Sequence, residues 1–409
     1  MTMGRGSLRT AGAAVAMLAG VMALHGTAAA QATVASDRPA GLVIWPKIVV
    51  DTIDAFNQGR TVDTTIQFTN TSSSIRTIQC FIVDTTSRCN NGTNRFSTSE
   101  ACREGQVPSD CLPGGACLPE WSETDFPVTL SPRQPFGWTA SEGGTVPPAG
   151  GAPGGSINPT DTVFTGEVKC VEVNSQAAAL PINANDIKGE ANIYEVSTVN
   201  TGSVDVRSYN AIGVQTVLND GSTQNDQVLC LGATSGSAEC ATAEYASCPA
   251  VLILNHFFDQ SVPGFERRTD LTLIPCSQNF AENDLTEQVV NAVQFLVYNE
   301  FEQRFSASTR FQCFRETQLS LIDSRPGQER FSIWNVGVQG TLTGQTRIRS
   351  IVGPENDVGH GVLAVAEQFR EFVAVANGDE IGSAAFNLNY VGLNPGRGDF
   401  VRYSVSTGP

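Results

Sequence analysis

Short runs of alternating apolar and polar residues recur along almost the whole chain. One run covers residues 64–69 (TTIQFT), and another covers residues 75–83 after the polar turn at 70–74 (NTSSS). Val, Ile, Thr and aromatic residues dominate such runs, and Gly, Pro, Asn and Ser separate them, which is typical of strands joined by turns. The pattern predicts an all-β protein in which 64–69 and 75–83 pair as a hairpin.

The order of these runs occurs twice. The matched segments are 42–46 with 271–275, 66–68 with 293–295, 79–81 with 312–314, 136–138 with 332–334, 165–167 with 343–345, 189–195 with 361–367, and 209–210 with 386–387. They hold alternating apolar residues, aromatic residues and turn glycines, as two sheets packed face to face require. The repeat predicts two tandem β-sandwich domains from an internal duplication, with Trp138 and Trp334 in their cores.

The repeat also sets the domain boundaries. We predict a signal peptide at 1–30, an N-terminal leader at 31–40, a first sandwich at 41–262 and a second at 263–409. The first sandwich carries a cysteine-rich insertion, and a Gly/Pro-rich insertion at 141–160 that we interpret as a flexible surface excursion. Residues 361–376 fit either an amphipathic helix or a strand, and the register of the repeat favours the strand.

The N-terminus has the order of a secretory signal. Arg5 and Arg9 precede an apolar run at 11–24, and the small residues Ala28 to Ala30 follow it. This order is that of a signal peptide, and the apolar run is too short to span a bilayer. We therefore expect cleavage near Ala30 and a secreted, periplasmic or cell-surface protein.

All eleven cysteines follow the predicted signal. Export favours disulfides, and the lack of a C-x2-C pair disfavours zinc. We expect Cys80 and Cys170 to bridge the two sheets of the first sandwich, and Cys276 to pair with Cys313 in the second. The other disulfide candidates are Cys89, Cys102, Cys111, Cys117, Cys230, Cys240 and Cys248. Because the number is odd, at least one thiol stays unpaired or joins another chain.

The charge of the chain limits the classes of molecule that it is expected to bind. The formal net charge is −16, charged residues make up 16% of the chain, and only three lysines occur. Binding of nucleic acid needs clustered basic residues, so the composition argues against it. Glycans and other envelope or extracellular proteins remain as expected partners, with no membrane span.

Candidate chemistry is sparse, and we assign no catalytic residue. His256 lies in an apolar strand and is interpreted as structural, whereas His360 lies in a loop beside acids but has no marked nucleophile nearby. Glu167, Glu195 and Glu367 lie on predicted strands. They are the candidates for a carboxylate pair of a glycoside hydrolase, although we interpret them as solvated faces of a sheet.

Two further ligand classes have candidate residues. Acidic loops offer oxygen ligands for calcium, the one cofactor that the sequence suggests, at Asp220, Asp226, Asp357 and Asp379. Trp121 lies in the cysteine-rich insertion, where we expect an exposed ring that faces a ligand. With Trp45 it is the candidate for stacking on carbohydrate.

Residues 42–83 resemble the first strands of immunoglobulin-like or fibronectin-like bacterial extracellular modules. An apolar strand ending in Pro46 precedes the segment 67–71 (QFTNT) and a small polar turn. The whole chain is similar to uncharacterised secreted proteins of Gram-negative bacteria. The resemblance implies a β-sandwich fold and an exported protein. Together with the repeat and the cysteines, it favours a structural, adhesive or binding role at the cell envelope or outside the cell. The alternatives are a secreted carboxylate-dependent hydrolase and a carbohydrate-binding module.

Overall fold

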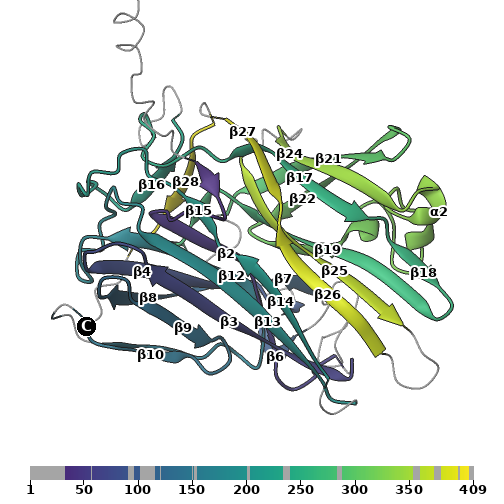
Figure 1. Cartoon of the computed structure of the whole chain (residues 1–409), viewed down its shortest axis with the longest axis horizontal. Coiled ribbons are helices and arrows are strands. Elements are labelled where there is room, and N and C mark those ends of the chain that lie inside the picture. The colour runs from purple at the N-terminus through teal and green to yellow at the C-terminus, as the bar shows by residue number, and fades with distance from the viewer. Residues whose placement is uncertain are drawn as a thin grey trace, which may run out of the picture. The chain divides into compact units, whose positions relative to one another are not determined.

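Antiparallel strands make up nearly all of the regular structure in the computed structural model (Figure 1). The structure describes residues 33–56, 58–90, 96–101, 116–119, 121–149, 151, 154–199, 203–233, 240–282, 288–352, 360–372, 379–394 and 397–404. The predicted signal peptide lies outside these residues. No helix in the described ranges is long and apolar enough to cross a membrane.

One large sheet and its side strands occupy the N-terminal half. Its strands are β1 (Val34–Ala35), β2 (Leu42–Asp51), β3 (Arg60–Asn70), β4 (Arg76–Asp84), β8 (Ser122–Leu130), β9 (Pro135–Thr139), β12 (Val163–Val173), β13 (Ile187–Ser197), β14 (Val204–Asn210) and β15 (Ile212–Val214). The main order is β14-β13-β3-β2-β12-β4-β8, with β9 beside β3 and β15 between β1 and β2. We call this set the N-terminal sheet group.

The large sheet folds over on itself between β2 and β3. These two strands share a single residue pair, Asp51 with Val62, so the ladder turns a corner there. Aromatic contacts then join the two layers: the ring centroids of Trp45 and Phe68 are 6.0 Å apart, and those of Phe126 and Trp138 are 5.6 Å apart. Trp138 is buried in this core, as the sequence predicts.

The predicted hairpin between the runs 64–69 and 75–83 is wrong. These runs form β3 and β4, but β3 pairs with β13 and β9, whereas β4 pairs with β12 and β8. The chain crosses from one layer to the other at the intervening turn. Asn70 is fully buried there, and its side-chain amide donates to the carbonyl oxygens of Ser74 and Ser131. These bonds give hydrogen-bond partners to backbone carbonyl groups at the crossing, where no neighbouring strand supplies them.

Two further sheets form the C-terminal sheet group. One has the order β22-β21-β24-β17-β27 and the other β18-β19-β25-β26, with β23 beside β19. The strands are β17 (Pro249–Phe257), β18 (Gln260–Val262), β19 (Phe265–Pro275), β21 (Val290–Asn299), β22 (Arg304–Gln312), β23 (Arg315–Gln318), β24 (Thr343–Ile351), β25 (Val362–Phe372), β26 (Asp379–Asn387) and β27 (Asn389–Leu393). Strand β25 confirms the strand interpretation of 361–376 over residues 362–372, and residues 373–376 lie outside the described residues.

The two C-terminal sheets enclose one apolar core. It includes Leu254 of β17, Leu271 of β19, Phe295 of β21 and Ala364 of β25. Trp334 is fully buried in this core, 5.6 Å from the Phe295 ring centroid. It lies in a turn that follows the short helical turns η3 (Leu319–Leu321) and η4 (Glu329–Phe331) and precedes helix α2 (Val336–Gln339).

Small sheets complete the fold. Strand β28 (Asp399–Arg402), close to the C-terminus, pairs with β16 (Val228–Leu231) and β20 (Gln278–Asn279). In the cysteine-rich insertion, β5 (Ser87–Asn90) pairs with β6 (Phe96–Ala101) and β7 (Ala116–Pro119).

Most described residues of the Gly/Pro-rich insertion at 141–160 are exposed or partly exposed, as expected of a surface segment, but the insertion is anchored to the core. It forms the hairpin of β10 (Gly144–Val146) and β11 (Gly155–Ile157), and Val146 and Ile157 are buried in the N-terminal core. Two apolar residues at matched positions of the hairpin thus anchor a segment whose composition suggested flexibility.

The sequence repeat has a partial counterpart in the strand pairing. The matched segments 189–195 and 361–367 lie on β13 and β25, which pair with the matched strands β14 and β26. Other matched strands pair differently, since β12 lies between β2 and β4 whereas β24 lies between β21 and β17. Strand β17 precedes residue 263 in the sequence yet pairs with strands of the C-terminal group. The division into two domains stays a prediction.

Candidate functional site

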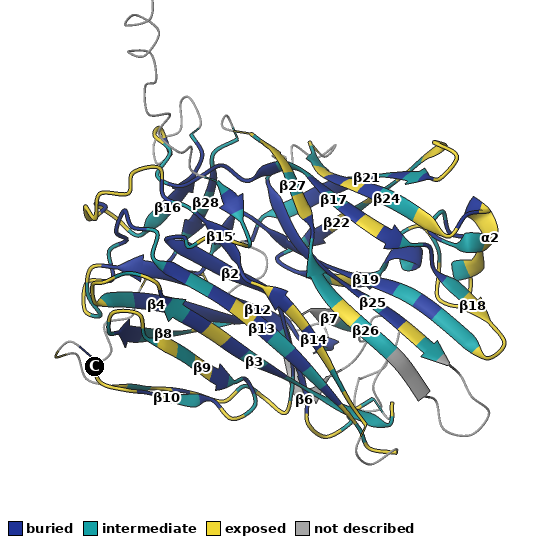
Figure 2. Ribbon diagram, in the orientation of Figure 1, coloured by how far each residue is buried: buried dark blue, intermediate teal, exposed yellow. Residues whose placement is uncertain are grey.

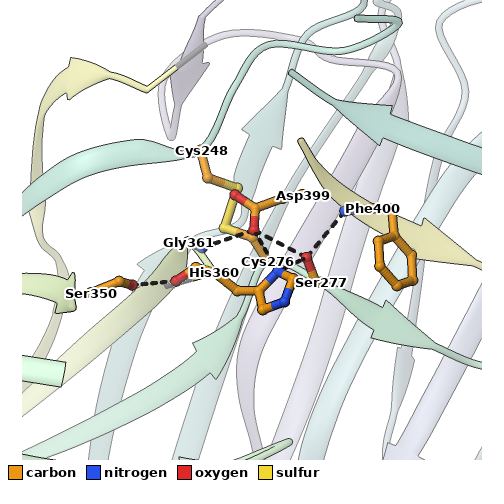
Figure 3. Close-up of a disulfide and its surroundings, with 8 residues drawn as sticks. All are labelled: Cys248, Cys276, Ser277, Ser350, His360, Gly361, Asp399 and Phe400. Carbon is orange, nitrogen blue, oxygen red and sulfur yellow. Dashed lines mark hydrogen bonds and ion pairs between the residues drawn. A yellow bond between two sulfur atoms is a disulfide. The ribbon is translucent and has the colours of Figure 1, made fainter. Parts of the chain in front are cut away.

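Ser277, His360 and Asp399 meet where three segments of the chain lie side by side (Figure 3). Ser277 lies between β19 and β20, His360 directly precedes Gly361 and β25, and Asp399 begins β28. The Ser277 Oγ lies 2.8 Å from His360 Nδ1 and donates to Asp399 Oδ1 at 3.0 Å. His360 Nδ1 and Asp399 Oδ1 are 3.3 Å apart. Asp399 is fully buried, and the His360 side chain is 12% exposed.

This cluster does not have the geometry of a serine triad. In a triad the histidine contacts the serine through one ring nitrogen and the acid through the other. Here both contacts are made by Nδ1, and the Ser277 hydroxyl also accepts a hydrogen bond from Phe400 N at 3.1 Å. The hydrogen bonds therefore hold the ends of β20, β25 and β28 together and do not activate a nucleophile.

A disulfide between Cys248 and Cys276 lies directly beside Asp399 (Figure 3). One ligand atom from each of these three residues lies within 4.8 Å of the others, as in a metal site. The two sulfurs are bonded to each other, however, and a disulfide offers no thiolate. Asp399 Oδ1 instead accepts from Gly361 N at 2.8 Å, and its Oδ2 is buried with no protein partner.

The expected pairing of Cys276 with Cys313 is wrong. Cys276 directly follows β19 and is bonded to Cys248, which precedes β17, whereas Cys313 follows β22 and keeps a buried thiol. The pairing follows from which strand ends meet in the fold, and the sequence does not give that information.

Cys80 and Cys170 are joined, but not across two sheets. They lie directly opposite each other on the neighbouring strands β4 and β12. Cys230 is bonded to Cys240, within the expected cluster. Cys89 and Cys117 are also in disulfides, and Cys102 and Cys111 lie outside the described residues.

The three candidate glutamates are not solvated faces of a sheet. Glu167, Glu195 and Glu367 are at most 6% exposed. Glu167 accepts from Lys169 Nζ at 2.7 Å, and Glu195 contacts Arg60 at 2.7 Å and Arg207 at 2.8 Å. Each of the three therefore lies in the interior with a basic partner, and none of them belongs to an open pair of carboxylates.

Glu367 lies in an ionic cluster that joins the two sheet groups. It contacts Lys47 of β2 and, at 2.9 Å, Arg207 of β14, and Lys47 also contacts Glu316 at 2.7 Å. Burial opposes ionisation of Glu367, but the charges of Lys47 and Arg207 outweigh it and hold its pKa below the usual value. Burial alone would lower the pKa of Lys47, but Glu316 and Glu367 raise it above the ordinary value. Both groups are therefore charged at neutral pH.

Among the described residues, Asp220 and Asp226 do not belong to a cluster of three or more potential metal ligands. Asp220 accepts from Ser222 N at 2.9 Å and Asp226 from Val228 N at 3.0 Å, so each caps its own turn. Hydrogen bonds from Ser222 hold the pKa of the exposed Asp220 below its usual value. Asp379 begins β26, and Asp357 lies outside the described residues. Calcium binding stays a prediction.

The candidate ligand-facing tryptophans are both buried. Trp121 is 4% exposed, donates from Nε1 to Glu282 O at 3.1 Å and stacks on Phe280 at 6.3 Å. Trp45 is fully buried in the N-terminal core. The expectation that Trp121 is exposed is therefore wrong, and neither ring offers a free face to carbohydrate.

His256 is a buried structural residue, in agreement with its apolar sequence context. Its Nε2 lies 2.8 Å from Thr346 Oγ1, and its Nδ1 lies 3.1 Å from Phe257 O. The same threonine accepts from Trp334 Nε1 at 3.0 Å. Burial lowers the pKa of His256 to about 4, so the imidazole is neutral at physiological pH.

The sequence analysis did not identify several residues of these clusters, among them Lys47, Lys169, Ser277, Gln278 and Asp399. One signal was present, because Lys47 and Lys169 each stand inside an apolar strand sequence, LVIWPKIVV and VFTGEVKCVEV. A lysine in such a run is expected to have a buried acidic partner.

Comparisons with known proteins add little. No protein-family model and no curated protein matches the chain. Among solved structures, the chain is similar to the CupB6 tip adhesin from Pseudomonas aeruginosa, at 9% sequence identity and a TM-score of 0.12, over 90% of this chain and 93% of that chain. Similarity at that TM-score carries no argument about this chain.

Proposed function

We propose that the chain is an exported, disulfide-stabilised tandem β-sandwich protein with a structural or adhesive role at the cell envelope or outside the cell. The N-terminal segment 1–30 supplies the export signal, and disulfides are typical of exported proteins. The repeat of strand runs, with its shared β13–β14 and β25–β26 hairpins, supports an internal duplication.

An exposed apolar surface at one end of the C-terminal sheet group carries the proposal. Its side chains are Phe301, Phe331, Val338 and Leu342, which are 67%, 64%, 41% and 54% exposed. They come from the turn between β21 and β22 and from the segment around α2, where Figure 2 shows exposed positions. Asn299 Nδ2 bonds Gln339 O at 3.4 Å and Thr343 N bonds Glu300 at 2.9 Å, so these segments are neighbours. Clustered exposed apolar side chains are typical of protein-binding surfaces.

A protein partner fits this surface better than a glycan or a hydrolase substrate. The rings expected to stack on sugars, Trp45 and Trp121, are buried, and the exposed rings of this surface, Phe301 and Phe331, carry no polar atom to bond sugar hydroxyls. A carboxylate hydrolase would need two acids in an open cleft, and Glu167, Glu195 and Glu367 hold basic partners in the interior. The partner we propose is another envelope or extracellular protein.

The test is capture of partners from a solubilised cell-envelope fraction on the immobilised protein. We expect a specific protein that the double variant Phe301→Ser/Leu342→Ser no longer retains. Leu218→Ser is the matched control, because Leu218 is 56% exposed in the N-terminal half and its loss should leave capture unchanged. Equal capture by both variants, or a glycan-array signal without a protein partner, would contradict the proposal.

A further inference from the structure

Two of the three lysines of the chain are buried, and Lys169 lies outside the ionic cluster of Lys47. Lys169, on β12, is fully buried beside Glu167, which is also fully buried two residues earlier on the same strand. A β-bulge between Gly166 and Val168 interrupts the pairing of β12 with β2 at Glu167. Gln278 of β20, which is 1% exposed, completes the group.

The amine and the amide are bound to one carboxylate. Lys169 Nζ donates to Glu167 Oε2 at 2.7 Å, and Gln278 Nε2 donates to Glu167 Oε1. The remaining polar atom of the amide, Gln278 Oε1, is buried with no hydrogen-bond partner. Glu167 therefore holds a nucleophilic amine and an amide side by side in the interior.

Aromatic rings cover this group. The Phe280 ring centroid is 5.4 Å from Lys169 Nζ, and Phe280 stacks on Phe81 at 5.1 Å and on Trp121 at 6.3 Å. Burial lowers the pKa of Lys169, and the attraction of Glu167 only partly offsets it. This amine therefore loses its proton more readily than an ordinary lysine, and the deprotonated amine is the nucleophilic form.

We propose that Lys169 and Gln278 form an intramolecular isopeptide bond, with Glu167 as the proton shuttle. Lys169 Nζ attacks Gln278 Cδ, the Nζ–Cδ bond forms and the Cδ–Nε2 bond breaks. Glu167 takes a proton from Nζ and passes it to Nε2, which leaves as ammonia. The step balances without an oxidant or a further reactant. It links β12 of the N-terminal sheet group to β20, and it is independent of the proposed function.

Cys313 is the competing nucleophile. Its thiol is buried near the same group, and its pKa is raised well above the usual value, first by burial and then by Glu167. A thiol held protonated attacks an amide poorly. We therefore assign the role of nucleophile to Lys169, whose amine donates directly to Glu167.

Peptide mapping of the folded, exported protein after reduction, alkylation and trypsin digestion tests the proposal. Trypsin cannot cleave at an acylated Lys169, so we expect peptide 134–188 joined to peptide 269–304, at their summed mass less one ammonia. The mass is read on this species and not on the whole chain, because an N-terminal Gln31 exposed by cleavage also loses ammonia on cyclisation. Lys169→Arg and Glu167→Gln should each lose the linked species, and Lys188→Arg, at the third lysine, should retain it.

Two results would overturn the proposal. One is cleavage at Lys169 with an intact Gln278 in the folded wild-type protein. The other is a linked species that joins Gln278 to Cys313, which would identify a thioester. Both are read on the wild-type chain, so the proposal is decided even where the Glu167 variant does not fold.

Discussion

At the scale of single residues, the protein buries ionisable side chains and gives most of them specific partners. A buried charge is strongly destabilising unless it is paired, and a buried histidine avoids the cost by staying neutral. Lys47 with Glu367, and Arg207 with Glu195, illustrate the first solution, and His256 illustrates the second. The pH dependence of the free energy of unfolding can therefore be assigned to individual buried groups.

His256 predicts a loss of stability in acid. Its pKa is near 6.5 in the unfolded chain and about 4 in the folded protein, so the unfolded state binds the extra proton between these values. Stability is therefore fully present above pH 6.5 and falls as the pH drops toward 4, by about 3 kcal/mol for this group. Urea unfolding of the wild type and of His256→Gln should show a difference that shrinks by this amount over that range. A constant difference between pH 7 and pH 4 would contradict the assignment.

At the scale of elements, the alternating pattern gave the strands but not their partners. The run 64–69, residues 76–83 and residues 362–372 all lie within strands, because alternation reports one buried face per strand. The partner of each strand depends on contacts far apart in the sequence, and β3 and β4 lie in different layers although only a short turn joins them. The predicted partner of Cys276 was wrong for the same reason, since Cys248 lies near Cys276 only when β17 and β19 are packed in the fold.

The close approach of β25 to the disulfide predicts that Gly361 cannot be replaced. A Cβ at this position would lie 2.4 Å from Cys248 Cβ, 2.7 Å from Asp399 Oδ2 and 2.8 Å from Cys276 Sγ. Because a disulfide and a buried carboxylate cannot move aside freely, Gly361→Ala should lower the free energy of unfolding by about 1–3 kcal/mol. Thermal and urea unfolding measure the change.

Gly155→Ala is the matched control for this substitution. Gly155 also lies in a strand region, but its Cβ would meet Pro127 O and Val146 Cγ2 only at ordinary contact distances of 3.7 and 4.0 Å. We expect a change within about 0.5 kcal/mol. Equal effects of the two substitutions would show that crowding at the disulfide is not the cause.

At the scale of the whole molecule, the two sheet groups are held together by polar contacts as well as by packing. Lys47 and Arg207 of the N-terminal group meet Glu367 and Glu316 of the C-terminal group, and Asn210 N donates to Asn387 Oδ1 at 3.1 Å. In a separate small sheet, strand β28 pairs with both β16 and β20 and so joins backbone segments that are far apart in the sequence. The sequence repeat indicated two halves, but nothing in it located these contacts between them.

The ionic cluster predicts that Lys47 is needed for the stability of the whole chain. Lys47→Met keeps most of the side-chain volume but leaves Glu367 with Arg207 alone and removes a partner of Glu316. Breaking a buried ion pair on one side costs about 3–5 kcal/mol, and urea unfolding at neutral pH should show a loss of this size. Lys188→Met is the control, since Lys188 is only half-buried and its hydrogen bond to Asp37 O is long, at 3.4 Å; its effect should be small.

The pH dependence separates a lost charge from lost packing in the Lys47 variant. In the wild type the pKa of Glu367 is lowered, so its stabilising contribution is present above the ordinary carboxyl value of 4.5 and is lost as the pH falls through the lowered pKa. Without Lys47 the pKa of Glu367 rises, and protonation removes the uncompensated charge at a higher pH. The gap between Lys47→Met and wild type should therefore narrow as the pH falls below about 5. A gap that stays constant with pH would assign the loss to packing of the lysine stem rather than to its charge.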